Sequence, residues 1–473
     1  MEKLFKLKEN GTTVKTEIVA GLTTFMTMAY IIALNPNLLT NFDTGSPLWN
    51  AVFCATLIST AIGTFCMAFL ANKPFVMSSG MGLNSFFATV VVQIVAITGA
   101  TYTQGFQAAL IIILIEGVLF LALSAFNVRE KIVEAIPISI RIGISPAIGM
   151  MLLNIGLGSN VGIYSETGGP FYIMRDFFGA LTAKSAQLAM GSGWGVMVVT
   201  VITVFVGLVA IVVLDHKGFK GAVLVGMLIA SVFYWLCDFI FLGQNPFASL
   251  ASANWLPPIG DMVETTLFKF DFKTLANLGV TSVITLIITF CIIDMFDTIG
   301  TLVGTASRAG MVDEQGNMPK MKEALVADAV GTIVGGVTGT STITTFVESA
   351  SGVEAGGRTG LTALVAGIMF LLCLFISPIA AIIPAAATSS ALIYVGVLMI
   401  SGLRSLNFDN KLGIVPVLLM LIAMPVSGSI GHAIGIGMIT YCLIRIFVGK
   451  AKDVSVLSWV ISAIFVIKFF LPI

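Results

Sequence analysis

The sequence predicts an all-α polytopic membrane protein with about fourteen transmembrane segments, arranged as two inverted repeats of seven. The first observation is composition: 57% of the 473 residues are hydrophobic and only 10% are charged, whereas soluble domains carry about 25% charged residues. Apolar runs of about 20 residues, the length that an α-helix needs to cross the hydrocarbon core, recur along the whole chain. The third observation is that a stretch in the first half of the chain has a counterpart in the second half.

The apolar runs divide into two sets of seven. In the first half we expect membrane spans at 17–39, 48–72, 80–98, 104–126, 142–160, 192–214 and 219–243. In the second half we expect them at 276–304, 322–340, 345–357, 360–384, 386–403, 411–428 and 430–448. The C-terminal apolar stretch within 451–473 either crosses the membrane or lies at its interface.

Basic residues predict the orientation of these spans. Of the 24 Lys and Arg residues, four (Arg175, Lys184, Lys269 and Lys273) fall on the predicted outer side. Lys468 is left unassigned, and the remaining nineteen fall on the cytoplasmic side. Because positive residues collect in cytoplasmic loops, we expect a multi-pass protein of the cytoplasmic membrane with its N-terminus in the cytoplasm.

The two halves share a pattern around a helix break. AIGTFCMAFLANKPFVMSSGMGLN (61–84) and AVGTIVGGVTGTSTITTFVESASG (329–352) each contain a small-residue helix end, a short β-prone stretch and a Gly/Ser-rich helix start. Seven spans per half place the two copies in opposite directions, as in transporters with inverted repeats. We therefore expect short strands before the helices of spans 3 and 10, lining a cavity or buried in protein. Two loops at the membrane edge are the alternative.

Three carboxyl groups lie at membrane depth in the second half. Asp294 and Asp297 are three residues apart in span 8, and Glu348 follows the second break. Buried acids usually face a cavity or a partner, so these residues are candidates for binding a substrate and carrying a proton. For Asp294, bracing of a neighbouring helix is the alternative.

Other residues of the breaks and spans are candidates for the substrate site or for contacts between helices. Asn84, at the start of span 3, offers both donors and acceptors to a heterocycle, or is a plain helix-start residue. Gly82, Phe346 and Ser349 belong to the same break segments and are further candidates for the substrate site. We expect Glu116 to brace span 4 against another helix, because buried charges must be paired.

A cytoplasmic turn and several absent motifs complete the prediction. Glu354 and Arg358 flank the turn GVEAGGRTG and are expected to order it or the inner gate. The six cysteines form no C-x-x-C pair and there are two histidines, so we expect no metal site or cofactor. The sequence contains no nucleophile–base pair that would indicate an enzyme and no phosphate-binding loop that would indicate direct use of ATP. It also contains no basic run that would indicate binding of nucleic acid.

Several of these motifs together resemble one family. GMGLNSFF, DMFDTIGTLVG and TTFVESASGVEAGGRTG, with the opening EIVAGLTTFMTMAYIIALNP and the elbow EAIPISIRIGIS, are similar to the AzgA-like purine permeases. That family lies within the xanthine/uracil permease and nucleobase–ascorbate transporter superfamily. The similarity runs from about residue 15 to about residue 450.

The resemblance implies a fold and its domains. Repeats at 15–243 and 276–450 would form a core domain (about 15–126 with 276–384) and a gate domain (about 142–243 with 386–448). Asn84 matches the polar position of the family's span 3. Asp297, with Asp294 one turn earlier, and Glu348 match the acidic positions of spans 8 and 10.

The resemblance also implies a substrate and a driving force. It implies import of a purine nucleobase, either guanine/hypoxanthine or adenine, by proton symport. A carrier of the same fold for uracil, xanthine or a small anion is the alternative. Partners would be the purine, protons and the lipid bilayer, and whether the chain forms a homodimer stays open.

Overall fold

The computed structural model describes residues 2–41, 43–126, 137–157, 184, 192–308, 311, 318–427 and 430–470. The predicted outer loop at about 160–190, apart from residue 184, and residues 134–136 of the elbow lie outside the described residues.

The first half consists of helices and one short strand. Its elements are α1 (Glu2–Phe5), α2 (Val14–Met28), α3 (Ile31–Leu39), α4 (Pro47–Cys66), the π-helical η1 (Met67–Ala71), β1 (Met77–Ser79), α5 (Met81–Thr98), α6 (Tyr102–Ala125), α8 (Ile138–Leu157), α11 (Ser192–His216), α12 (Ala222–Cys237) and η3 (Asp238–Leu242). The first predicted span is therefore two helices, α2 and α3, that meet at Ala29 and Tyr30.

Three short helices connect the halves, and the second half repeats the plan. The connecting helices are η4 (Ala248–Ser252), α13 (Ile259–Thr265) and α14 (Phe272–Asn277). Then follow α15 (Val280–Arg308), α16 (Met321–Thr338), β2 (Ile343–Thr345), α17 (Ser349–Glu354), α18 (Gly360–Leu372), η5 (Cys373–Ile376), α19 (Ser377–Ala381), α20 (Ala385–Ile400), η6 (Ser401–Ser405), α21 (Lys411–Ser427), α22 (Ile430–Phe447), η7 (Ala451–Asp453) and α23 (Val456–Phe470).

Helix ends follow local sequence signals. Ser46 caps α4 by accepting a hydrogen bond from Trp49 N at 3.1 Å, and Thr101 and Gln104 form a capping box at the start of α6. Helix α5 ends at Gly99, whose φ of 68° is the left-handed conformation that glycine adopts without strain. These caps satisfy backbone groups that have no partner within the helix.

Helices occur at every predicted span, with different lengths. Within the described ranges, nine helical segments are long and apolar enough to cross a membrane. Four more are apolar but shorter: Val280–Met295, Lys411–Ser427, His432–Phe447 and Val456–Ile467. Helix α17 has only six residues, where we expected a helix over 345–357. The total of fourteen crossings therefore stays a prediction, as does the placement of α23 in the membrane or at its interface.

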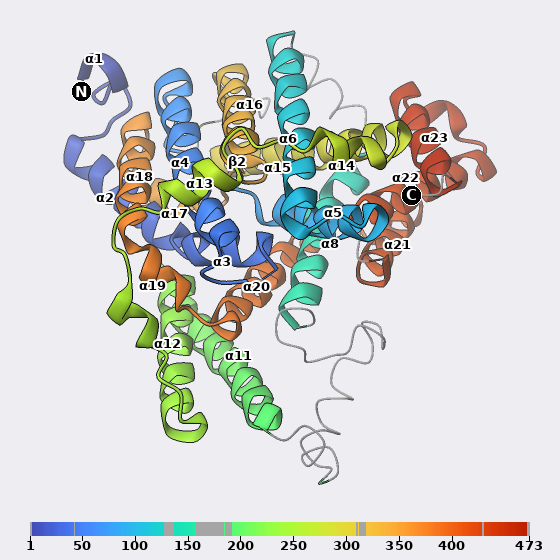
Figure 1. Ribbon diagram of the computed structural model, residues 1–473. Coiled ribbons are helices and arrows are strands. Elements are labelled where there is room, and N and C mark those ends of the chain that lie inside the picture. Colours follow the sequence, from blue (N-terminus) through green and yellow to red (C-terminus); the bar gives the residue numbers. More distant parts are fainter. Residues whose placement is uncertain are drawn as a thin grey trace.

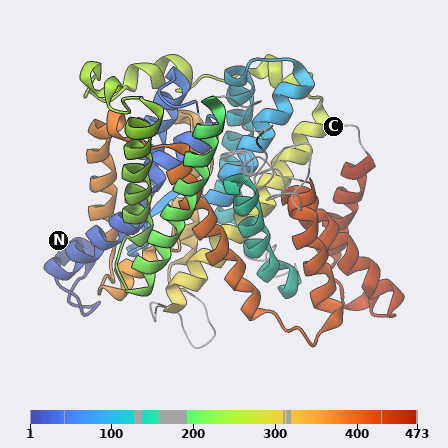
Figure 2. The ribbon, with the colours of Figure 1, turned by 90° about the horizontal axis from the view of Figure 1, so that it is seen from below.

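The helices pack in two groups (Figure 1). Helices α2, α4, α6, α16, α17 and α18 pack on one another, and so do α8, α11, α12, α20, α21 and α22. Helices α5 and α15 pack on α6 of the first group and also contact α8 of the second, and α2 contacts α12. The grouping follows the predicted core and gate domains, although their exact boundaries stay a prediction. Figure 2 shows α1 and α23 on opposite sides of the molecule.

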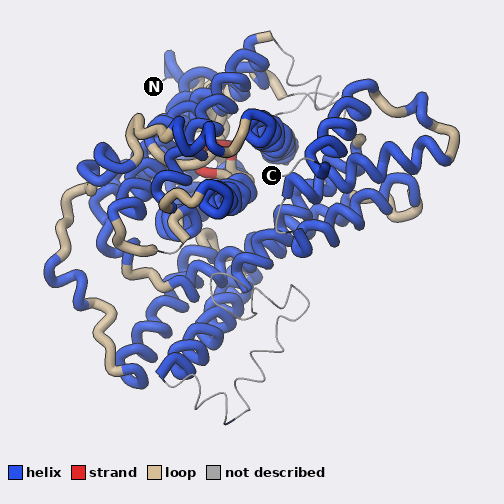
Figure 3. Tube along the Cα trace, turned by 45° about the vertical axis from the view of Figure 1, so that its right-hand side comes forward, coloured by secondary structure: helices blue, strands red, loops and turns tan. Residues whose placement is uncertain are grey.

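The two strands meet inside the first group of helices (Figure 3). Strands β1 and β2 are antiparallel, with Met77 opposite Thr345, Ser78 opposite Thr344 and Ser79 opposite Ile343. All three residues of each strand are buried. This pairing satisfies backbone groups that could not remain open at membrane depth, and it confirms the predicted strands before the helices of spans 3 and 10.

Candidate functional site

The pairing of β1 with β2 places one helix start at each end of a short two-stranded ribbon. Backbone hydrogen bonds extend the pairing beyond the strands, from Gly80 N to Thr342 O at 3.2 Å and from Phe346 N to Val76 O at 3.0 Å. Because the strands are antiparallel, α5 and α17 leave from opposite ends of the two-stranded ribbon. A helix start carries a partial positive charge, so each end of the ribbon has one; at the start of α17 the N–H groups of Ser349, Ala350 and Ser351 already donate to backbone oxygens of residues 346–348.

Asp297 of α15 faces the start of α5. A Cβ atom placed on Gly80 would lie 3.3 Å from Asp297 Oδ2, so the carboxylate reaches this backbone because glycine has no side chain. Asp328 and Glu348 are the charged groups whose fields act on Asp297. The side chain of Asp297 is partly exposed, and it can therefore meet both a ligand and the other acids.

Asp294, one turn earlier on α15, belongs to a buried cluster. Thr298 Oγ1 lies 3.0 Å from Asp294 Oδ1, 3.0 Å from Asp328 Oδ1 and 2.8 Å from Thr344 Oγ1. All four residues are at most 1% exposed. Thr298 thus ties α15 to α16 and to β2, whereas the contact between Asp294 and Thr298 lies within α15. The bracing role of Asp294 stays a prediction.

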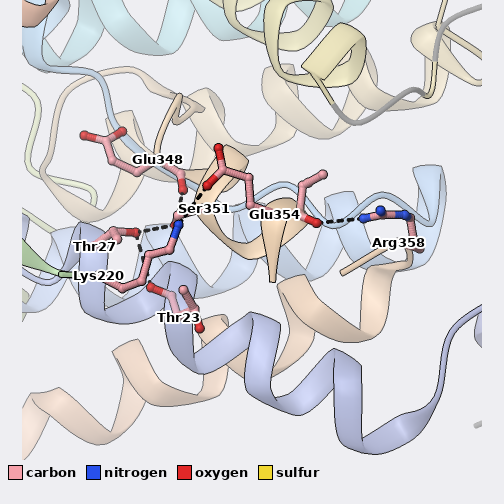
Figure 4. Close-up of polar contacts among 8 residues, drawn as sticks. Thr23, Thr27, Lys220, Glu348, Ser351, Glu354 and Arg358 are labelled. Atoms are coloured by element: carbon pink, nitrogen blue, oxygen red, sulfur yellow. Dashed lines mark hydrogen bonds and ion pairs between the residues drawn. The ribbon is translucent and has the colours of Figure 1, made fainter. Parts of the chain in front are cut away.

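Glu348 lies at the start of α17, and Figure 4 shows its link through Ser351 to Thr27 of the first span. Its Oε1 accepts a hydrogen bond of 2.6 Å from the Tyr30 hydroxyl. Its backbone oxygen accepts one of 2.7 Å from Ser351, and Ser351 Oγ lies 3.0 Å from Thr27 Oγ1. Glu348 is partly exposed whereas Tyr30 is fully buried. The Tyr30 hydroxyl thus holds one oxygen of the carboxylate, and Thr27 of α2 contacts Ser351 in the next turn.

Asn84 is part of a buried amide network. Its Nδ2 donates to Asn35 Oδ1 at 2.5 Å and to Ser79 O at 3.1 Å, and its Oδ1 accepts from Ser341. Asn35 in turn donates to Thr56 and Thr340. Both amide hydrogens of Asn84 therefore bond to protein groups in this conformation. Its contact with a substrate stays a prediction.

The three remaining candidates of the break segments pack against different neighbours. Phe346 is 5% exposed, and Ser349 Oγ accepts a hydrogen bond of 3.0 Å from Val76 N. A Cβ on Gly82 would lie 2.5 Å from Cγ2 of Ile148 on α8. Because Gly82 has no side chain, α5 can approach α8 of the other group closely. Ser349 ties α17 to the residues before β1.

Glu116 and the cytoplasmic turn make contacts between distant segments. Glu116 of α6 is fully buried and accepts from Thr342 Oγ1 at 3.0 Å. Glu354, at the end of α17, forms an ion pair of 2.7 Å with Lys220 in the turn between α11 and α12. Arg358 Nη1 donates to the carbonyls of Val353 and Gly357. The gating role of this turn stays a prediction supported by an ion pair between the two helix groups.

Four residues that hold these groups together were not among the predicted site residues. Tyr30 contacts Glu348, Asp328 joins Asp294 through Thr298, and Asn35 contacts Asn84. Glu17 of α2 accepts from the backbone N of Arg358, Thr359 and Thr362, at the start of α18. Glu17 and Asp328 are acids within or beside apolar runs, a signal that could have identified both.

A separate cavity lies away from these acids. It has a volume of about 590 Å³ and is lined by residues of the α3–α4 connection and the starts of α4 and α6, with Glu264 and Thr265 of α13. None of the predicted site residues lines it, so it is not the predicted substrate site. Among the described residues, no group of three or more His, Cys, Asp or Glu is arranged to hold a metal ion.

Comparison with known proteins defines the class of protein. The sequence model of the Permease family matches residues 15–427, and the chain belongs to this family of membrane transporters. The transmembrane domain of a cyanobacterium bicarbonate transporter, BicA, has the same fold, with a TM-score of 0.62 over 89% of this chain and 96% of that one at 16% identity. The predicted fold, an all-α polytopic membrane protein of two inverted repeats with core and gate domains, is confirmed.

The similar curated proteins give a narrower group within that class. Adenine permease AdeP from Escherichia coli (strain K12) is 36% identical over 99% of this chain and 95% of its own length. Guanine/hypoxanthine permease PbuO from Bacillus subtilis (strain 168) is 35% identical over 99% of this chain and 100% of its own length. These full-length similarities confirm the family resemblance predicted from the motifs, and the relatives are permeases, not enzymes.

Proposed function

We propose that this chain imports purine nucleobases across the cytoplasmic membrane together with protons, with its N-terminus in the cytoplasm. Relatives at about 35% identity over almost the whole chain bear the names of adenine and guanine/hypoxanthine permeases. The basic residues that favour a cytoplasmic N-terminus support the orientation.

The observation that carries this proposal is the pair Asp297 and Glu348 beside the strand crossing. Both side chains are partly exposed, and the charge of Glu348 acts on Asp297. Purines present ring and exocyclic N–H donors in one plane, and a carboxylate is an acceptor with two oxygens. A hydrogen bond to such a charged group contributes more than one between neutral groups.

The same two acids are the proposed proton carriers. A charged carboxylate at membrane depth is costly unless it is paired, hydrated or protonated. Binding of a proton and a substrate together at Asp297 and Glu348, and their release together, would link the two movements at one site. Phe346, Gly82 and Ser349 would shape the ligand site, and Asn84 and Asp294 would hold the break segments or contact the purine edge.

Transport by purified protein tests the proposal. In proteoliposomes with an imposed inward proton gradient, we expect accumulation of labelled adenine, guanine or hypoxanthine, and loss of accumulation after a protonophore. Uracil, xanthine and bicarbonate serve as the comparison substrates. Preferred uptake of one of these three would contradict the purine assignment, and purine accumulation that survives collapse of the proton gradient would contradict the coupling.

A further inference from the structure

Among the described residues of the first span, Tyr30 makes a hydrogen bond to the carboxylate of Glu348, and Tyr30 is a residue that a ligand cannot reach. Tyr30 is 0% exposed, and its hydroxyl donates to Glu348 Oε1 at 2.6 Å. Glu348 itself is partly exposed. Tyr30 therefore lies behind the acid, and any influence on a substrate must pass through the carboxylate.

The position of Tyr30 follows from a break in the first span. Helix α2 ends at Met28 and α3 begins at Ile31, so Tyr30 lies between two helices instead of within one. A buried tyrosine hydroxyl normally finds a hydrogen-bond partner. Here that partner begins α17, 318 residues along the chain. A break in span 1 thus faces the break in span 10.

Further contacts hold α2 and α17 in one register. Thr27 Oγ1 lies 3.0 Å from Ser351 Oγ, and both residues are three positions along the chain from the Tyr30–Glu348 bond. Gly352 packs so closely on α2 that a Cβ there would clash with Thr24 Oγ1 and lie 2.8 Å from Ala20 O. The close packing of α2 against α17 therefore fixes the position of the Tyr30 hydroxyl relative to Glu348.

We propose that Tyr30 is the positioning residue of the substrate-binding carboxylate: its hydroxyl occupies Glu348 Oε1 and directs Glu348 Oε2 toward the ligand. The inference rests on the proposed substrate role of Glu348. A carboxylate held at one oxygen has lost rotational freedom before the ligand arrives, and preorganisation of this kind raises affinity without adding a contact to the ligand. Without the phenol, the acid must be ordered by the substrate itself.

The expected consequence is a change in affinity without a change in folding. Tyr30→Phe keeps the buried ring and removes one hydrogen bond to a charged group. We expect the KM for purine uptake to rise about tenfold, with the Vmax per folded protein unchanged. A role in packing alone would instead lower the amount of folded protein and leave KM as it is.

Tyr102→Phe is the matched control. The Tyr102 hydroxyl likewise donates to a protein oxygen, that of Leu39 at 2.8 Å, but its ring is only partly buried and no described hydrogen bond joins it to either acid. KM, Vmax and melting temperature are measured for both variants and the wild type in proteoliposomes. We expect similar melting temperatures for the two variants and a raised KM for Tyr30→Phe alone.

Each outcome of this experiment decides the question. A wild-type KM in folded Tyr30→Phe, or an equal rise of KM in both variants, would overturn the inference. If Tyr30→Phe does not fold, Thr27→Val replaces it, because this change loosens the register between α2 and α17 and keeps both the phenol and the acid. A wild-type KM in Thr27→Val would then overturn the inference. Failure of the wild type to transport any purine would instead refute the proposed function.

Discussion

The two strand–helix segments that cross at the centre of the core, β1–α5 and β2–α17, have matching backbones and different chemistry. Each is a three-residue strand followed within a few residues by a helix. Helix α5 has 18 residues and Gly80 at its N-cap, whereas α17 has six residues and Glu348 at its N-cap. From 75 to 98 the first segment has no charged residue, while the second has Glu348 and Glu354 within seven residues.

This difference indicates a division of labour between the repeats. In the first segment the polar side chain of Asn84 is buried and bonded to protein groups. In the second the carboxylate of Glu348 is partly exposed and held at one oxygen. We therefore propose that the β1–α5 segment contributes packing and fixed hydrogen bonds, and that the β2–α17 segment contributes the group that binds and releases a ligand or a proton.

The largest effect is expected from removing a charge in the second segment or beside it. Glu348→Gln and Asp297→Asn keep the shape of each side chain, so we expect normal insertion with uptake nearly lost. Loss of one charge-assisted hydrogen bond costs about 1.5–3 kcal/mol, which is roughly ten- to more than a hundred-fold in affinity. Purine binding and uptake are measured per folded protein.

Asp294→Asn is the control for these two variants, because Asp294 is fully buried in the cluster around Thr298. We expect it to lower stability more than affinity. Near-normal affinity and proton-coupled uptake in both Glu348→Gln and Asp297→Asn would remove these acids from the site.

The corresponding change in the first segment should act on stability. Asn84→Ala leaves Asn35 and Ser341 without their contacts to the amide, and an unsatisfied buried polar group costs about 1–3 kcal/mol. We expect a lower melting temperature and less folded protein, with the order of substrate preference kept. Unchanged stability together with a new substrate preference would contradict a purely structural role for Asn84. It would support a direct contact between Asn84 and the purine.

The smallest effect is expected at the ion pair between Lys220 and Glu354. Both side chains are about half exposed, at 49% and 60%, and such pairs contribute about 0.2–1 kcal/mol. We expect Glu354→Gln to change the transport rate slightly and to leave substrate affinity unchanged. The measurement is the rate of uptake at saturating substrate and at low salt.

Swapping the charges of Lys220 and Glu354 distinguishes a gating role of this ion pair from a contact without functional effect. Lys220→Glu alone places two acids side by side, and the double variant Lys220→Glu with Glu354→Lys restores an opposite pair. We expect the rate to fall in the single variant and to recover in the double one. Equal rates in all variants would show that the second segment has no functional link to the α11–α12 turn.

Much of the fold was predictable because it depends on local pattern. Apolar runs predicted helices, since a chain in lipid must satisfy its backbone groups within the segment. The Gly/Ser-rich breaks predicted β1 and β2 because β-prone stretches there interrupt otherwise helical runs. The lengths were less predictable: α17 ends after six residues, and α13 and α14 occur in a stretch for which no element was predicted.

The sequence by itself determined that this is a multi-span membrane protein with acids at Asp297 and Glu348, because hydrophobicity and the cost of a buried charge act residue by residue. Only the tertiary structure decided which partners those acids have. Glu348 meets Tyr30 and Glu116 meets Thr342 across separations of 318 and 226 residues. Such pairs depend on how helices and strands pack in three dimensions, and no spacing along the chain encodes them.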